Sequence, residues 1–137
     1  MKKIKRRGYV KGYTLSEILI VLVIIGILII LVLPNQSSVV AQAKSLEAQN
    51  MLSHLYNLEK SYFYRHSKYS ADIDDIGFVQ EKTIIEDGQA VYQITILEAT
   101  TNTFRAKAVA LSDFDGDGVF NEWEINHERK LTETVKD

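Results

Sequence analysis

Twelve residues, from Asp113 to Glu124, have the spacing of a calcium-binding loop. Aspartates occupy loop positions 1, 3 and 5, a glycine occupies position 6 and a glutamate occupies position 12, as in the pattern D-x-D-x-D-G-x5-E. Carboxylates two residues apart converge on one point only where the backbone curls, and Gly118 permits that curl. A hard dication would relieve their mutual repulsion. We therefore expect calcium as a cofactor, with ligands from Asp113, Asp115, Asp117, the carbonyl of Val119 and Glu124.

The loop pattern leaves alternatives open. An acidic turn rich in Asp and Gly could bind no metal. If Glu124 lies in a strand, its side chain could point away, and Asn121 or a backbone carbonyl would complete the site. The preceding segment, Phe104 to Leu111, alternates like a strand, so the loop would lie in a sheet and not between two helices. We also expect Phe120 to anchor the loop in the core.

A second chemically informative residue is Glu17, near the start of an apolar run. Residues 18–33 are sixteen residues of Ile, Leu and Val interrupted by Gly26, and counting from Tyr13 gives 21 residues. About 20 residues cross a bilayer core. An ionisable group in such a segment is costly and usually functional. Six cations and no acid precede residue 13, which predicts a cytoplasmic N-terminus and an external location for everything after Pro34.

Three interpretations fit this segment. It could be a plain signal anchor in which Glu17 is only an interfacial residue. It could be a secretory signal peptide, cleaved after the small residues at positions 41 and 43. The third interpretation accounts for Gly12 and Glu17 together. The run Gly12-Tyr-Thr-Leu-Ser-Glu17 resembles the type IV prepilin signature: a basic leader ending in Gly, an aromatic or apolar residue, Thr-Leu-x-Glu and then an apolar helix.

This resemblance implies cleavage between Gly12 and Tyr13 by prepilin peptidase, and methylation of the new Tyr13 amine. Gly8 also precedes a tyrosine, but only cleavage after Gly12 places an acid at the fifth mature position and Pro34 at the twenty-second. Tyr13 departs from the Phe that is commoner in the family. The resemblance further implies that Glu17 pairs with the Tyr13 amine of a neighbouring subunit during assembly.

The implied organisation is a cleaved leader at 1–12, a transmembrane and filament-core helix at 13–34, and a globular head at 35–137 that carries the loop at 113–124. The implied function is a structural subunit of a type IV pilus or pilus-like filament. The alternatives are the major pseudopilin of a type II protein secretion system and a membrane-tethered calcium-binding module.

The resemblance also implies partners and a location. The expected partners are other copies of the chain in a helical filament, prepilin peptidase, an inner-membrane assembly platform and, before assembly, membrane lipid. The expected location is the bacterial inner membrane, as a single-pass protein with a cytoplasmic N-terminus. Assembly would then place it in a pilus or pseudopilus, in the periplasm or at the cell surface.

Composition argues against other classes of protein. The chain has no cysteine, so calcium is the expected staple in place of a disulfide. Six of the 16 Lys and Arg residues lie in the leader, which leaves 10 against 18 acidic residues and a mature net charge of −8. This acidic balance argues against nucleic-acid binding as a core function. The sequence contains no nucleophile elbow and no glycine-rich phosphate loop, so we do not expect an enzyme.

The remaining pattern predicts an α+β fold, and the resemblance implies that this is the type IV pilin-like fold. Residues 15–64 are expected to form one long helix with a kink at Pro34, and its second half is expected to pack on a sheet. The predicted inward side chains are Val39, Ala43, Leu46, Leu52, Leu55, Leu58 and Tyr62, with Glu59 on the polar face. Alternation predicts antiparallel strands at 90–97, 103–110, 119–126 and 131–135, with Phe104, Ala106, Ala108 and Ala110 facing inward.

Overall fold

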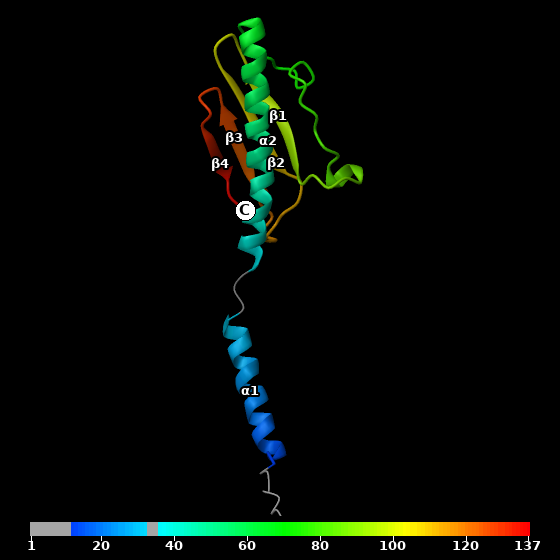
Figure 1. The fold of residues 1–137 in the computed structure, drawn as a ribbon, viewed down its shortest axis with the longest axis vertical. Helices are drawn as coiled ribbons and strands as arrows, with labels where there is room; N and C mark the ends of the chain where they lie inside the picture. Colours follow the sequence, from blue (N-terminus) through cyan, green and yellow to red (C-terminus); the bar gives the residue numbers. More distant parts are fainter. Residues whose placement is uncertain (1–11, 33–35) are drawn as a thin grey trace, which may run out of the picture. The chain divides into compact units, whose positions relative to one another are not determined.

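The computed structural model describes residues 12–32 and 36–137 (Figure 1). The chain divides into two compact units, Met1–Pro34 and Asn35–Asp137, and each is described by itself. The predicted kink at Pro34 lies outside the described residues. The elements are α1 (Leu15–Val32), α2 (Gln36–His66), a 3-10 helix η1 (Ile84–Glu86), β1 (Tyr92–Ala99), β2 (Phe104–Ala110), β3 (Glu122–Asn126) and β4 (Leu131–Val135).

Helix α1 is built almost entirely from Ile, Leu and Val. The β-branched residues among them are only moderate helix formers in water. In a bilayer, however, each backbone group must be bonded within its own segment, which favours a helix. No residue of α1 is buried by the described part of the chain. Its apolar side chains are thus exposed, as in a helix that lies in lipid or among other protein chains.

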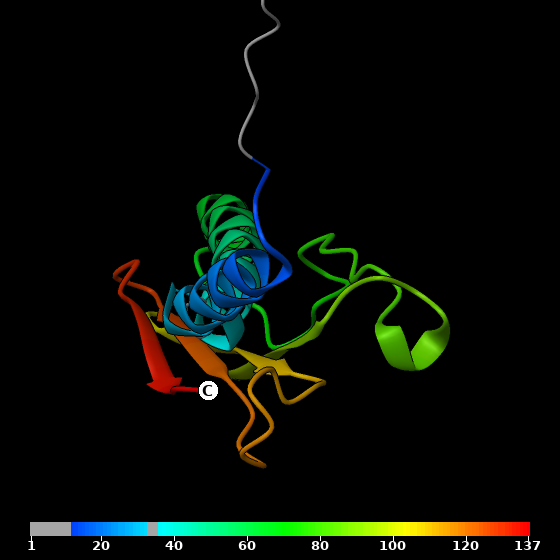
Figure 2. The same ribbon diagram turned by 90° about the horizontal axis from the view of Figure 1, so that it is seen from below.

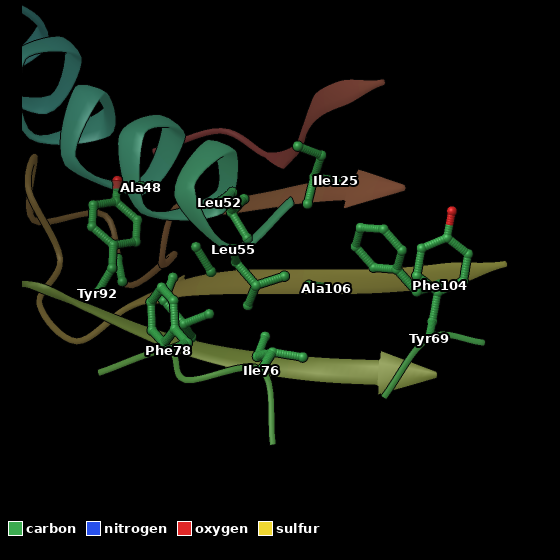
Figure 3. Packing of buried hydrophobic residues seen from close by; sticks show 13 residues of the cluster. Ala48, Leu52, Leu55, Tyr69, Ile76, Phe78, Tyr92, Phe104, Ala106 and Ile125 are labelled. Atoms are coloured by element: carbon green, nitrogen blue, oxygen red, sulfur yellow. The ribbon is translucent and has the colours of Figure 1, made fainter. Parts of the chain in front are cut away.

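Helix α2 lies across one face of a four-stranded antiparallel sheet, as two perpendicular views show (Figures 1 and 2). Facing the helix, β2 presents Phe104 and three alanines, each at most 3% exposed. Small residues let a helix backbone approach a sheet closely, and Leu52, Leu55 and Ile125 fill the remaining space (Figure 3). The predicted fold, a helix packed on an antiparallel sheet, is confirmed.

The predicted inward face of the helix is wrong in its first half. Val39 and Leu46 are 61% and 56% exposed, and Ala43 is exposed as well. The buried positions lie further round the helix, at steps of three and four residues. They are Ala41, Ser45, Ala48, Leu52, Leu55 and Glu59. The alanines of β2 let α2 approach the sheet closely. Small side chains in the first half of α2 therefore face the sheet, and the larger Val39 and Leu46 face outward.

The second half of the predicted face is confirmed, with one correction. Leu52 and Leu55 are fully buried, and Leu58 and Tyr62 pack partly buried against the core. Glu59, expected on the polar face, is fully buried. The error has a simple origin, because the polarity of a side chain does not report which side of the helix the neighbouring segment covers.

The sheet is a meander with strand order β1-β2-β3-β4. The first hairpin closes at Thr100, whose amide donates to the Thr103 carbonyl at 2.8 Å. A bulge between Ile96 and Glu98 ends the regular alternation of β1. The predicted strand at 131–135 is confirmed at both ends, and the other three begin one to three residues later than predicted.

The segment between α2 and β1 covers one side of the core. Tyr69, Ile76 and Phe78 are buried in it (Figure 3). The Gln80 side chain extends this cover to the free edge of β1: its Nε2 donates to the Tyr92 carbonyl at 3.2 Å, and its Oε1 accepts from the Ile94 amide at 3.1 Å. An uncovered edge strand invites unwanted pairing with other chains, and Gln80 occupies two of these edge groups.

Candidate functional sites

The first site is the N-terminal end of α1, where Thr14 and Glu17 form a capping box. The Thr14 amide and hydroxyl donate to Glu17 Oε2 at 2.8 and 3.0 Å, and the Glu17 amide donates to the Thr14 hydroxyl at 3.3 Å. Tyr13 lies just before this box and is 85% exposed. The structure therefore gives Glu17 a partner inside its own chain and leaves Tyr13 accessible.

The helix that follows meets the requirements of a membrane span by length and composition. It has 18 residues with a mean hydropathy of 3.2, and none of that stretch is buried. At ~1.5 Å per residue its length approaches the ~30 Å of a bilayer core. The same apolar surface would also suit the centre of a helical bundle.

The second site is the acidic loop between β2 and β3. The structure brings Asp113, Asp115 and Asp117 together: one carboxylate oxygen of each lies within 4.8 Å of the others. Gly116 and Gly118 make the required curl, with φ of 86° and 87°. In this left-handed region of φ, an L side chain would be strained. The convergence expected from the sequence is present.

Backbone amides hold these carboxylates in place. Asp113 Oδ1 accepts from the Gly116 amide at 2.6 Å, and Asp113 Oδ2 accepts from the Gly118 amide at 2.7 Å. These bonds, led by the one from Gly118, lower the pKa of Asp113. Partial desolvation, together with repulsion from Asp117 and Asp137, raises the pKa of Asp115. The loop thus concentrates negative charge around Asp115, which a cation would neutralise.

Two residues expected in this site, Glu124 and Phe120, do not have their predicted roles in the structure. Glu124 belongs to β3 and is not a member of the aspartate cluster, and its Oε1 accepts from Arg105 Nη1 at 3.1 Å. Phe120 is 44% exposed, so the prediction that it anchors the loop in the core is wrong. Phe114 takes that place: its ring packs against the core, 5.9 Å from the ring of Tyr92.

Sequence reasoning missed Asp137 as a partner of the loop. Its carboxylate accepts from the amides of Phe114 at 2.9 Å and of Asp115 at 3.2 Å. No local pattern signals a contact over more than twenty residues.

Asn121 is buried, with only 3% of its surface exposed. The sequence could have revealed this, because Asn121 continues the inward alternation of Ile125.

Comparison with known proteins returns two similarities. Residues 7–33 match the family model described as the prokaryotic N-terminal methylation motif. Over 72 residues the chain is 40% identical to the type IV major pilin protein PilA of Myxococcus xanthus (strain DK1622). The aligned part covers 53% of this chain and 33% of that protein, so the chain spans about a third of the length of the relative that it matches.

Proposed function

We propose that this chain is a structural subunit of a type IV pilus, inserted in the membrane as a prepilin and assembled through α1. The observation that carries the proposal is an apolar helix that the described chain leaves unburied, preceded by a methylation motif. A subunit with such a helix lowers its free energy by packing it against equivalent helices. The similarity to a major pilin favours a pilus over a secretion pseudopilus and over an enzyme.

Processing would occur between Gly12 and Tyr13, with methylation of the Tyr13 amine. Both residues precede α1 and are exposed. Gly12 has no side chain, so it can enter a narrow protease cleft in an extended form. The capping box starts at Thr14 and survives this cleavage, so the mature helix would keep its N-terminal cap.

Assembly would place Glu17 inside a bundle of apolar helices. Removing a carboxylate from water costs several kcal/mol unless the charge is paired. The Tyr13 amine of an adjacent copy supplies a suitable cation. Thr14 would keep the carboxylate oriented, because it donates from both its amide and its hydroxyl.

The exposed stripe of α2, formed by Val39, Ala43 and Leu46, supports the same proposal. These residues lie on one side of the helix at steps of three and four and do not contribute to the core. Further copies of the chain would cover them in a filament. The expected route is insertion in the inner membrane, cleavage by prepilin peptidase and extraction by an assembly platform into a pilus.

The test is direct sequencing of the assembled protein. Filaments sheared from cells should contain a chain that begins at N-methylated Tyr13, with 1–12 removed. A mature chain that begins after Ala43 would show that a signal peptidase processes the protein, and would refute the proposal. Cells without any filament containing this chain would refute the structural role.

We infer in addition that the loop at 113–119 binds calcium. The three aspartates and the Val119 carbonyl would supply oxygen ligands, and waters could complete a shell of six to eight. Asp137 would brace the loop from outside by holding the amides of Phe114 and Asp115. Glu124 would contribute only if it left Arg105.

Melting of the full chain in detergent tests this inference. At calcium about 100-fold above Kd, binding to the folded state alone adds about 2.7 kcal/mol. The melting temperature should rise in calcium and much less in magnesium, which prefers a smaller octahedral shell. Asp113→Ala and Asp117→Ala should abolish the rise, whereas Asp74→Ala, at an exposed aspartate in another loop, should not. An unchanged melting curve in calcium and in chelator would leave the loop as an acidic turn.

A further inference from the structure

The segment between α2 and β1 carries a small ordered loop, residues 82–90, which we call the η1 loop. Backbone bonds close its base: the Ile84 amide donates to the Ala90 carbonyl at 2.9 Å, and the Ala90 amide donates to the Lys82 carbonyl at 3.1 Å. Gly88 lies so close to this base that a Cβ there would overlap the Lys82 carbonyl. Backbone bonds and close packing thus fix the shape of the loop.

The η1 loop displays two isoleucines outside the core. Its first turn is held by a capping box, in which the Thr83 amide and hydroxyl donate to Glu86 Oε2 at 3.2 and 3.1 Å. No residue of η1 is buried, and Ile85 is 74% exposed beside the half-exposed Ile84. The yellow-green helix η1 lies to the side of α2 and away from the sheet (Figures 1 and 2). Apolar side chains on such an ordered projection are typical of a contact with another molecule.

The charge around the η1 loop indicates what that molecule presents. Glu81, just before the loop, and Glu86 and Asp87 within it are exposed. Lys82 is the one cation in residues 81–90, so three acids against one base give this stretch a net charge of −2. An apolar tip beside exposed acids fits an apolar or aromatic surface that carries cations.

The C-terminal end of α2 is a surface of that kind. Tyr64 is 81% exposed, and Arg65 and Lys68 next to it are exposed as well. Residues 60–71 contain no Asp or Glu. Tyrosine and arginine are also enriched where proteins contact one another. We call residues 64–68 the basic end of α2.

The cations of the basic end are available to another chain. Among the residues that the structure describes, neither Arg65 nor Lys68 forms an ion pair. The acids that follow in sequence are bonded within turns of their own. Asp72 Oδ1 accepts from the Asp74 amide at 2.9 Å, and Asp75 Oδ2 accepts from the Ser70 hydroxyl at 3.1 Å.

We propose that the η1 loop of one copy docks on the basic end of α2 of a second copy. The two isoleucines would cover the Tyr64 ring, and the acids of the loop would lie beside Arg65 and Lys68. Figure 1 shows η1 to the side of α2 and the basic end at the top of that helix, so the contact joins different copies. A contact between two different surfaces repeats from copy to copy and builds rings or helical filaments. The inference rests on the proposed filament and names a contact between heads, in addition to the packing of α1.

Cysteine cross-linking tests the contact, because the chain has no cysteine of its own. Ser61→Cys lies one helical turn before Tyr64, Gln89→Cys lies in the η1 loop, and both positions are exposed. Filaments that carry both substitutions are treated with a short thiol-specific cross-linker and should give a ladder of covalent multimers on a denaturing gel. Each single variant should stay monomeric. Gln89→Cys combined with Ala43→Cys, on the exposed stripe of α2, should stay monomeric as well.

Substitution of the contact residues gives a second measurement. Ile85→Ser and Tyr64→Ser should each lower the yield of filaments about tenfold, because each removes apolar area from the contact. Val79→Ser is the matched control, since Val79 is 82% exposed but lies outside the η1 loop, and it should leave the yield unchanged. All three variants should melt like the parent, because the substituted side chains are exposed.

The outcomes separate the docking from the filament proposal. If the parent forms no filament that contains this chain, the proposed function itself is refuted. If the parent forms filaments, the docking is overturned when filaments with Ser61→Cys and Gln89→Cys give no ladder, or when the Ala43→Cys pair cross-links equally well. It is also overturned if Ile85→Ser forms as many filaments as the parent.

Discussion

Glu59 is a fully buried carboxyl group in the middle of the contact between α2 and the segment that follows it. Its Oε2 accepts from the Ser70 amide at 3.2 Å, and among the described residues its Oε1 has no partner. Burial outweighs this bond and raises the pKa of Glu59 to about 7. The folded chain therefore holds this proton more tightly than the unfolded chain, where the ordinary value is 4.5.

The sign of the resulting pH effect follows from linkage. The contribution of neutral Glu59 to stability is fully present below the unfolded pKa, and it is lost as pH rises through about 7. We expect the free energy of unfolding of the full chain in detergent to fall by up to about 3 kcal/mol as Glu59 ionises. Glu59→Gln should remove this loss, and Glu81→Gln, at an exposed site, should retain it. A parent and a Glu59→Gln variant with the same pH profile would contradict the assignment.

Glu17 can serve as a helix cap, as an ion-pair partner between subunits, or as both. Two substitutions separate these roles, because glutamine at this position can still accept the Thr14 bonds of a capping box but carries no charge. We expect Glu17→Ala and Glu17→Gln both to insert and to be cleaved, and both to give few or no filaments by electron microscopy. Normal filaments from Glu17→Gln would show that capping alone is the function of Glu17.

At the scale of elements, α2 has two apolar faces with different uses. One face, from Ala41 to Leu55, packs on the sheet. The other, with Val39 and Leu46, is exposed. A helix that is apolar on an unpartnered side either contacts another molecule or favours aggregation. The proposed filament provides such a contact.

Substitutions on the two faces of α2 should therefore affect different properties. Leu46→Ser should change the free energy of unfolding of the unassembled chain by no more than about 0.5 kcal/mol, since the residue is exposed. The same variant should reduce the yield of filaments. Leu52→Ala should cost about 2–5 kcal/mol of stability, because it opens a cavity in the core. Thermal melting and filament yield are measured for both. Unchanged filament yield with Leu46→Ser would exclude this face from subunit contacts.

At the scale of the whole molecule, the proposed cleavage after Gly12 would remove the basic leader. It would leave an acidic subunit with a new amine at Tyr13, next to α1. Because the amine at Tyr13 arises only on cleavage, processing is coupled to the proposed pairing with Glu17. The side chain introduced by Gly12→Val should prevent this segment from entering the narrow cleft of the protease. The cell should then accumulate an intact precursor in the inner membrane and form no filaments. Mass spectrometry of the membrane fraction measures this. A chain of mature mass from the variant would place the cleavage site elsewhere.

Much of this protein could be predicted from its sequence, because the relevant signals are local. Periodicity predicted the helix that packs on the sheet and all four strands, and alternation predicted the inward alanines of β2. The spacing of the aspartates, together with Gly118, predicted that their carboxylates converge. The apolar run and its preceding motif were likewise visible without coordinates. Each of these depends on residues within one element, where spacing along the chain translates directly into direction in space.

Only the tertiary structure decided which side chains meet across elements. It turned Leu46 outward, because small side chains in the first half of α2 face the sheet. It turned Glu59 inward, where the segment after α2 covers it and the Ser70 amide donates to it. It joined Glu124 to Arg105 and made Phe114 the anchor of the acidic loop, which Asp137 braces. These contacts join residues far apart in sequence, and long-range packing, with no local periodic signature, determines them.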